Sequence, residues 1–479
     1  MKTIIKSFLL LLVVTFASCE LPDNIDPKSA SVVTAASLIT SAEINLFTQV
    51  TSLSTNFNIS RLLTQYHSEV TYVTESRYNF SDRKLPDAHW GVIYRDVLAN
   101  LVEAKKLINA TDFADAGKKA NQLAIINILE AYSYQLLVDV FGNVPYTEAN
   151  LGIVNSRPKY DDAKTVYYAM IDQLSSSITN LTDASEGFGD ADILYKSDIN
   201  SWKLFANSLK LRFALRISDS DASKASTMVK EAIAGGLYTD ESESAIYTPT
   251  GTAPYVGCYY NWAVIEARPK DYVPTKTLID MMNSFNDPRR PIWFTKYNGS
   301  FVGLTFGLKA ASSYSKFSHF NSILQSIAYP SIILDYSEVE FLLAEAAERG
   351  LGGVTGTAES HYNKAITANM EYWGVSATDI ATYLAQPSVA YATSTGTWKQ
   401  KIGTQKWLAL YDEGYESYAE WRRLDFPILN PPQDMTYADI PVRYPYPFDE
   451  VKYNKDNYQA ASAAIGGDLI STKLFWDKH

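Results

Sequence analysis

Cysteine is nearly absent from the 479-residue chain, which contains only Cys19 and Cys258. Cys19 directly follows a short apolar stretch near the N-terminus, so Cys258 is the one cysteine left in the body of the protein. A lone cysteine forms no intramolecular disulfide, which excludes a disulfide-stapled fold. A chain of this length buries enough apolar surface to fold without one.

Positive charge is also in short supply. The 42 Lys and Arg against 53 Asp and Glu give a formal net charge of −11. Nucleic-acid binders neutralise phosphates with clustered Lys and Arg, so this balance argues against a nucleic-acid partner. The 23 glycines are too few for a collagen-like repeat, and 46% hydrophobic residues are too many for a disordered chain.

Motifs for catalysis are missing as well. The five histidines show no HExxH or other metal-ligand spacing, and the chain has no GxSxG elbow, P-loop or dinucleotide fingerprint. Cys258 lies among apolar and aromatic residues, which is typical of a structural thiol. Glycoside hydrolysis would need two carboxylates, and none of the 53 acidic residues stands out as half of such a pair. The sequence therefore predicts no catalytic site and no metal-ligand set.

The N-terminus has the pattern of a secretory signal. Two lysines precede an apolar stretch at 8–16, which is too short to span a bilayer, and Ala17-Ser18 then precede Cys19. A cysteine after two small residues is typical of a bacterial lipobox, in which the cysteine is lipidated and becomes the mature N-terminus. We therefore expect a signal peptide at 1–18 and a lipidated tether at 19–28.

Helical periodicity covers much of the body. The predicted helices span 120–141, 199–217, 336–349 and 358–373, and Trp90, Ile93, Tyr94, Val97 and Leu101 form a further core-facing stripe. The stretch 120–141 is apolar nearly all the way round, which predicts a helix buried inside a stack. Ser337 and Glu340 have the spacing of a capping box at the start of their helix.

Small and aromatic residues recur at the spacing of a tetratricopeptide repeat. The positions are Ala346, Ala358, Tyr362 and Ala365, with looser echoes at Ala163, Tyr167 and Met170 and at Ala225, Val229 and Ala232. Between helices, 237–274 and 293–329 are loop-rich, and Tyr297–Ser300 carries a type I′ hairpin signal. We expect a mostly α fold in which tetratricopeptide-like helix pairs pack with a loop-rich region containing short β-hairpins.

Nine blocks, in order along the chain, resemble the SusD/RagB family of nutrient-binding outer-membrane lipoproteins, in its SusD-like branch. They are FASC ending at Cys19, QYHSE at 65–69, WGVIYRDVLANL at 90–101, AYSYQLLVDVFGNVPYTEA at 131–149, SWKLFANSLKLRFALR at 201–216, NDPRRP at 286–291, YPSIILDYSEVEFLLAEAAERG at 329–350, QKWLALYDEGYESYAEWRRLDFP at 405–427 and IPVRYPYPFDEVKYN at 440–454.

This resemblance implies a single SusD-like domain over 29–479, with loop-rich ligand-binding insertions near 237–330 and 375–400. It implies a lipoprotein on the cell-surface side of the outer membrane of a Gram-negative bacterium, anchored at Cys19. It also implies a SusC-like TonB-dependent transporter as partner, an oligosaccharide or in some members a peptide as ligand, and no cofactor. Some members bind a metal ion, but no DxDxDG-type loop supports one in this chain.

Ligand residues vary within the family, so the site is predicted from chemistry. Sugars stack an apolar face on aromatic rings and need polar partners for their hydroxyls, and the chain has 33 Tyr, 20 Phe and 9 Trp. Two loops, 72–80 and 255–268, combine these residue types. The candidate ligand residues are Tyr72, Arg77, Tyr78, Asn79, Tyr255, Tyr259, Tyr260, Asn261, Trp262 and Arg268, with Trp262 at the centre. The alternative for each ring is that it only closes the end of the helical stack.

Three functions remain open at this point. The first is a non-catalytic glycan-binding lipoprotein that serves a transporter, and the second is the same scaffold with a peptide ligand. The third is a surface hydrolase, which needs a catalytic pair that the sequence does not show. Trp421, Arg422, Arg423 and Asp425 resemble a charged site, but such a group at the end of a helix more often forms a structural ion pair.

Overall fold

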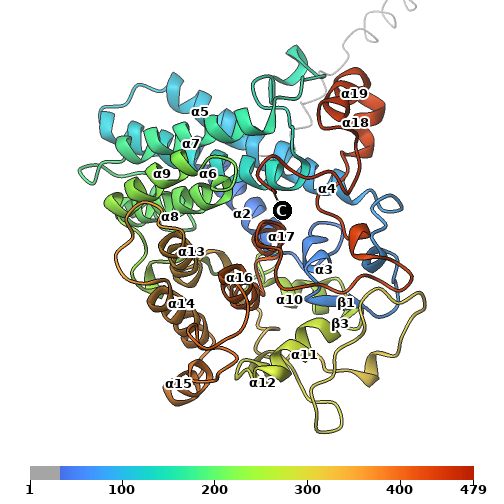
Figure 1. Ribbon diagram of the computed structural model, residues 1–479. Helices are drawn as coiled ribbons and strands as arrows, with labels where there is room; N and C mark the ends of the chain where they lie inside the picture. Colours follow the sequence, from blue (N-terminus) through green and yellow to red (C-terminus); the bar gives the residue numbers. More distant parts are fainter. Residues whose placement is uncertain (1–32, 479) are drawn as a thin grey trace, which may run out of the picture. The chain divides into compact units, whose positions relative to one another are not determined.

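A computed structural model describes residues 33–478, and helices dominate it (Figure 1). The predicted signal peptide at 1–18 and tether at 19–28 lie outside the described residues. From Ala35 onward the chain forms one compact unit. The helices are α2 (Ala35–Thr51), α3 (Ser60–Leu63), α4 (Leu85–Gly91), α5 (Ala99–Ala110), α6 (Ala116–Phe141), α7 (Ala163–Asn180), α8 (Ile199–Ile217), α9 (Ala222–Gly235), α10 (Cys258–Tyr260), α11 (Lys276–Ser284), α12 (Arg290–Trp293), α13 (Tyr336–Glu348), α14 (Ala358–Tyr372), α15 (Ala377–Leu384), α16 (Trp398–Ala409), α17 (Gly414–Leu424), α18 (Phe448–Tyr453) and α19 (Lys455–Ala464).

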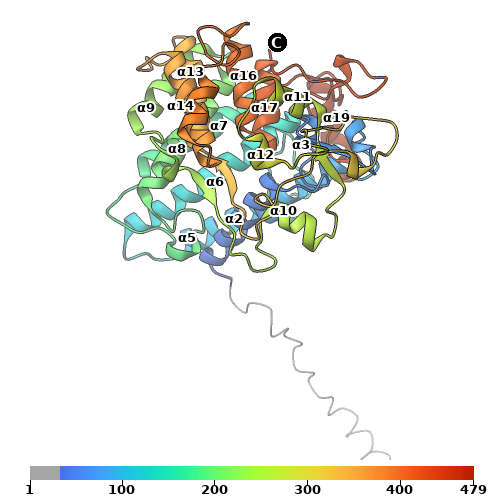
Figure 2. The same ribbon diagram turned by 90° about the horizontal axis from the view of Figure 1, so that it is seen from below.

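Successive helices pack in pairs, as the repeat spacing predicts. Helices α6 and α7, α8 and α9, and α13 and α14 lie side by side in both views (Figures 1 and 2). Ala346, Ala358, Tyr362 and Ala365 are all buried, because small side chains allow the two helix backbones to approach while the tyrosine fills the remaining gap. The mostly α fold with tetratricopeptide-like pairs is confirmed.

Helix α6 is the buried helix expected at 120–141, and it begins four residues earlier. The Asp115 carboxylate accepts the backbone N–H groups of Gly117 and Lys118, which caps its start, and Gly142 ends it with a φ of +84°. Within the described part of the chain, α6 alone has the length and apolar composition to cross a membrane, and its side chains are largely buried inside the protein.

The predicted capping box of the 336–349 helix is wrong. Asp335 is the N-cap of α13, and its carboxylate accepts the backbone N–H of Glu338. Ser337 instead donates its hydroxyl to the carbonyl of Ala365 in the neighbouring helix, and Glu340 binds a ring nitrogen of His361. Because Asp335 already accepts a backbone N–H of the first turn, the side chains of Ser337 and Glu340 are free to join α13 to α14.

Among residues 33–478, four short strands form two antiparallel sheets that join distant parts of the chain. Strand β1 (His67–Glu69) pairs with β3 (Tyr272–Pro274), and β2 (Ala245–Tyr247) pairs with β4 (Ser331–Leu334). The hairpin turn expected at Tyr297–Ser300 is present, because these two residues exchange backbone hydrogen bonds of 2.8 and 3.0 Å around left-handed Asn298 and Gly299.

Buried charges connect the helices of the scaffold. Arg216 of α8 donates to both carboxylate oxygens of Glu416, at 2.7 and 2.6 Å, and also to Glu420. Arg423 bridges Glu420 and Glu345, at 2.7 and 2.6 Å. Burial alone would raise the pKa of Glu420, but the nearby cations, including both arginines, hold it well below its usual value. Arg423 is therefore part of a structural ion-pair network, as predicted, whereas its neighbour Arg422 donates to backbone carbonyls, those of Tyr418, Val442 and Asp139.

Candidate ligand-binding site

The two predicted loops meet because β1 and β3 pair. The backbone N–H of Val70 donates to the carbonyl of Asp271 at 2.8 Å, directly beyond the strand pair. The loop after β1 and the segment before β3 therefore leave the same edge of the sheet. The Arg268 guanidinium carbon lies 5.6 Å from the centre of the Tyr72 ring, so one residue from each loop is in contact.

Tyr72 provides an exposed aromatic ring at this junction. Its exposed fraction is 54%, and the guanidinium of Arg83 also approaches the ring, at 5.7 Å from its centre. Each of these arginines has a carboxylate partner, since Arg268 pairs with Asp271 and Arg83 with Glu75. Tyr72 is thus held by cation–π contacts on a surface where the neighbouring charges are paired.

The structure exposes the predicted ligand residues unequally. Tyr72 and Tyr255 are exposed; Tyr260, Asn261, Arg268, Arg77 and Asn79 are half-buried; and Tyr259, Trp262 and Tyr78 are buried. An exposed tyrosine ring is a suitable contact for a ligand that has both apolar faces and hydroxyl groups, and Tyr72 and Tyr255 each provide one.

Trp262 and Tyr259 point into the protein. Trp262 is only 2% exposed and packs against Tyr272 and Phe320, with ring centres 5.5 and 5.7 Å apart. The Tyr259 hydroxyl donates to Asp412 at 3.1 Å. Helix α10 and the π-helical η6 (Asn261–Ile265) turn both rings inward. These eight residues are too few to show a helical period, so the sequence alone predicts a loop here.

Side chains of the loop at 72–80, called the early loop below, fix its conformation. Arg77 donates to the carbonyls of Gly307 and Gln433, at 2.8 and 2.9 Å, and so ties the loop to two distant segments. The Asn79 carboxamide closes a local turn by accepting the backbone N–H groups of Ser81 and Asp82. In this conformation both residues hold the loop in place.

Two buried carboxylates lie at the same loop, Glu69 just before it and Glu75 within it. Glu69 and Glu75 are 4% and 1% exposed, and burial together with the nearby charge of Glu75 raises the pKa of Glu69 to about 8. Glu69 accepts the backbone N–H and the hydroxyl of Ser76, at 2.7 and 2.9 Å. Carboxylates that cleave a glycosidic bond must reach the sugar from two sides, and these two are buried away from the surface.

Neither Cys258 nor a metal cluster adds chemistry to this region. Burial raises the pKa of the Cys258 thiol to about 12, so the thiol stays protonated at neutral pH. Within residues 33–478, no group of three or more His, Cys, Asp or Glu side chains could hold a metal ion.

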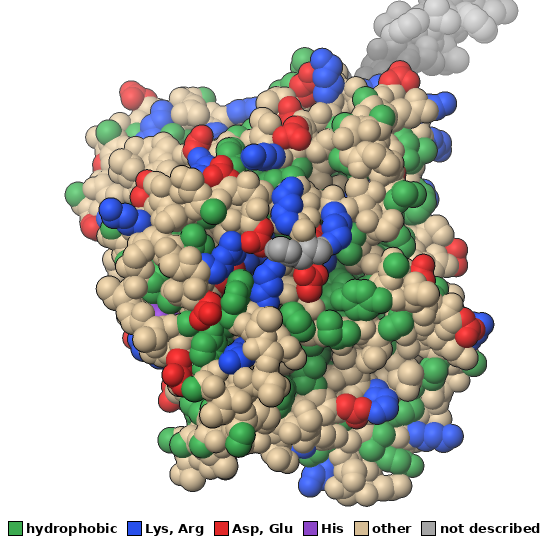
Figure 3. Space-filling model, viewed as in Figure 1, with side chains coloured by type: hydrophobic (Ala, Val, Ile, Leu, Met, Phe, Trp, Pro, Cys, Tyr) green, Lys and Arg blue, Asp and Glu red, His purple; other side chains and the backbone are tan. Residues whose placement is uncertain are grey.

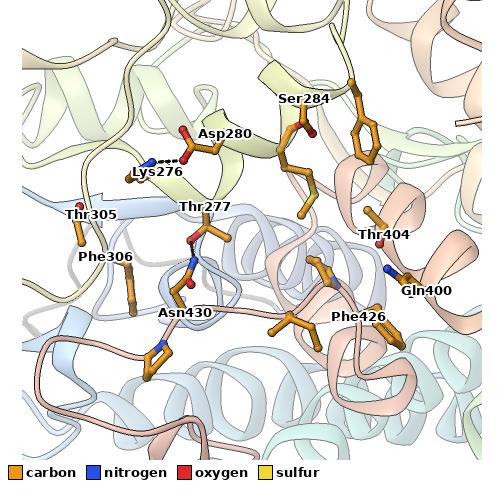
Figure 4. Close-up of a pocket in the computed structure, with 15 residues that line it drawn as sticks. Lys276, Thr277, Asp280, Ser284, Thr305, Phe306, Gln400, Thr404, Phe426 and Asn430 are labelled. Carbon is orange, nitrogen blue, oxygen red and sulfur yellow. Dashed lines mark hydrogen bonds and ion pairs between the residues drawn. The ribbon is translucent and has the colours of Figure 1, made fainter. Parts of the chain in front are cut away.

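A large pocket lies elsewhere, and sequence reasoning missed it. It has a volume of about 780 Å³ and lies between α11, α16, the segment 305–306 and the loop 426–431 (Figure 4). Its lining comes from four segments that are far apart in sequence, and none has a motif of its own. The one signal is indirect, because the resemblance block at 405–427 contributes Phe426 and Pro427 to its wall.

Comparison with known proteins identifies the family. The family model described as "Starch-binding associating with outer membrane", of the SusD-like type, matches residues 27–447. Among solved structures, a chitin-binding protein is 27% identical, with a TM-score of 0.80 over 93% of this chain and 100% of its own.

Two further solved structures share the fold. A chitin-binding SusD homologue from Flavobacterium johnsoniae is 24% identical, with a TM-score of 0.78 over 92% of this chain and 99% of its own. A SusD homologue from Bacteroides thetaiotaomicron is 23% identical, with a TM-score of 0.78 over 94% of this chain and 100% of its own. No curated protein sequence matches this chain. Because the family model covers most of its length, the chain belongs to the SusD/RagB family.

Proposed function

We propose that this protein captures an oligosaccharide at the cell surface and delivers it to a SusC-like TonB-dependent transporter, without cleaving it. One observation carries the proposal: the chain resembles a chitin-binding protein over 93% of its length, at 27% identity. The family description, which names starch binding and association with the outer membrane, supports both the ligand class and the location.

The proposed contact surface is the junction of the two loops. The exposed rings of Tyr72 and Tyr255 would stack on sugar faces, while Tyr260, Asn261 and Arg268 would reach the hydroxyl groups. We place Trp262 beneath this surface, where its ring supports the segment from inside. Arg77, Tyr78 and Asn79 would hold the early loop in its binding conformation.

The ligand class is tested by calorimetric titration of residues 20–479 with chitin, starch and uronic acid oligosaccharides and with short peptides. We expect saturable binding of at least one glycan and none of the peptides. Binding of peptides alone would replace the glycan by the peptide alternative. Chromatography of the glycan after prolonged incubation should show an unchanged chain length, and shortened products would show a hydrolase.

The proposed anchor is a lipid on Cys19, at the end of a signal peptide over 1–18. Cys19→Ala should release the full chain from the membrane fraction or block its maturation, because no acyl chain can then attach to the N-terminus. A Cys19→Ala protein that is processed normally and stays in the outer-membrane fraction would rule out this anchor.

A further inference from the structure

The large pocket is a candidate for a second ligand site. Its volume of about 780 Å³ falls within the range of small-molecule sites. On the face drawn in Figure 3, hydrophobic side chains gather in the area between α16, α3 and α11. In Figure 4, Phe306 and Thr305 lie on one side of the space, and Gln400, Thr404 and Phe426 lie on the other. The pocket is therefore open to solvent and has aromatic rings on two sides.

Gln65, which is not itself part of the lining, ties two lining residues of the pocket together. Its buried side chain donates to the carbonyl of Asn430 at 2.5 Å and accepts the Thr277 hydroxyl at 2.7 Å. Asn430 in turn donates its amide to Thr277 at 3.2 Å. The 426–431 loop and α11 are thus joined through one enclosed side chain. A pocket whose walls are fixed in this way loses little entropy when a ligand binds.

Uncharged polar groups face the space between apolar walls. Gln400 and Thr404 are one turn apart on α16, and Thr305 lies opposite them. None of these three side chains has a hydrogen-bond partner among the described residues, so their amide and hydroxyl groups can serve a ligand. Half-buried Phe426 and Phe285 supply apolar surface beside them. Rings next to free amides and hydroxyls are the surface that a sugar needs.

The pocket presents no net charge. Lys276 and Asp280 are the only charged residues in its lining, and they pair with each other at the rim. A uronic acid or a phosphorylated ligand would therefore meet no unpaired cation. This charge balance selects a neutral ligand.

The backbone around the pocket is poor in free donors. Pro427 and Pro431 carry no N–H group, and much of the remaining lining belongs to α11 and α16, whose backbone groups bond within the helices. A bound peptide relies on main-chain hydrogen bonds to its partner, and few are on offer here. The lining therefore favours a saccharide over a peptide.

We propose that this pocket is a second saccharide-binding site, which takes the end or a short stretch of a neutral glycan. The proposal rests on the glycan-binding function proposed above and adds a location separate from the loop junction at Tyr72. A long glycan that reaches both sites would bind more tightly than a short one, because the second contact becomes intramolecular.

The test uses short neutral probes, tetra-N-acetylchitotetraose and maltotetraose, in calorimetric titrations of residues 20–479. We expect two binding sites for whichever probe the wild-type protein binds, and one site after Ser284→Trp, since an indole at this exposed rim position would fill the pocket mouth. Gln400→Ala should weaken the second site two- to tenfold through the loss of neutral hydrogen bonds. Trigalacturonate should not bind there.

Matched variants separate a blocked pocket from general damage. Gln459→Ala removes another exposed glutamine, on α19, that does not line the pocket, and Ser223→Trp places an indole on α9. Both should leave two sites. If the wild-type protein binds a probe and Ser284→Trp and Gln400→Ala change neither the stoichiometry nor the affinity, the second site is wrong while the proposed function stands. If the wild-type protein binds no glycan at all, both are wrong.

Discussion

The helical scaffold and the loop-rich region use their polar residues in different ways. Between α8, α13, α16 and α17, buried arginines and glutamates neutralise one another, as Arg216 and Arg423 do with Glu420. Around the loop junction and the large pocket, tyrosines, amides and hydroxyls reach the surface beside paired charges such as Arg268 with Asp271 and Lys276 with Asp280. The difference indicates that charge maintains the fold, whereas neutral surface remains for the ligand.

Removal of one buried cation from the helical scaffold should have the largest effect on the stability of the protein. Arg216→Met would leave Glu416, Glu420 and Asp139 buried with one cation fewer, because the Arg216 side chain is fully buried among them. We expect a loss of about 3–5 kcal/mol in the free energy of unfolding, measured by chemical denaturation. Lys106→Met, which breaks an exposed ion pair with Glu103, should change it by less than about 1 kcal/mol. Equal effects of the two variants would remove the distinction between scaffold and surface charge.

A buried ring of the loop-rich region should matter to stability nearly as much. Trp262→Ala removes an indole packed on Tyr272 and Phe320, and we expect a loss of about 3 kcal/mol. Tyr255→Ala, an exposed ring of the same segment, should leave the melting temperature almost unchanged. If Trp262→Ala weakens glycan binding at an unchanged melting temperature, Trp262 contacts the ligand and our placement of this ring is wrong.

A smaller effect on stability, which depends on pH, comes from the buried carboxyl pair Glu69 and Glu75 at the early loop. The folded protein holds a proton on Glu69 up to a pKa of about 8, above the unfolded value, so the unfolded state binds fewer protons between roughly pH 4.5 and 8. The contribution of Glu69 to the free energy of unfolding is therefore at its full value below pH 4.5 and falls as the pH rises to 8. Glu69→Gln should remove that loss, with a gain on the order of 1–3 kcal/mol at pH 8 and little gain at pH 4.5. Thermal denaturation at both pH values would show it, and an equal gain at both would contradict the shifted pKa.

The sequence predicts the scaffold well because its signals are local. Helix α8 has the predicted bounds of 199–217, and α13 and α14 end within one residue of theirs. Long helices repeat their apolar face several times, so a few exceptions do not hide the period. The wrong capping box at Ser337 shows the limit of this approach, since Asp335 and Ser337 compete for one helix end and only the packed neighbour at Ala365 decides.

The candidate site is less predictable because it depends on long-range pairing. Nothing near residue 72 in sequence shows that it lies beside Arg268; the β1–β3 pairing alone places them together. Composition drew attention to Trp262 and Tyr259, yet it does not distinguish a ring that faces solvent from one that packs on Phe320. The large pocket combines four separate segments, and only the folded chain shows that Gln400 and Phe306 face the same space.

The most direct test of the central claim is the glycan affinity of Tyr72→Ala, measured by calorimetry beside Tyr453→Ala, an exposed tyrosine on α18. The stacking of a sugar on the Tyr72 ring should contribute on the order of 1 kcal/mol, so its loss should weaken binding at the loop junction about five- to tenfold. Tyr453→Ala should bind like the wild-type protein, and both variants should keep its melting temperature. An unchanged affinity in Tyr72→Ala would contradict the claim that exposed neutral rings at the loop junction bind the glycan.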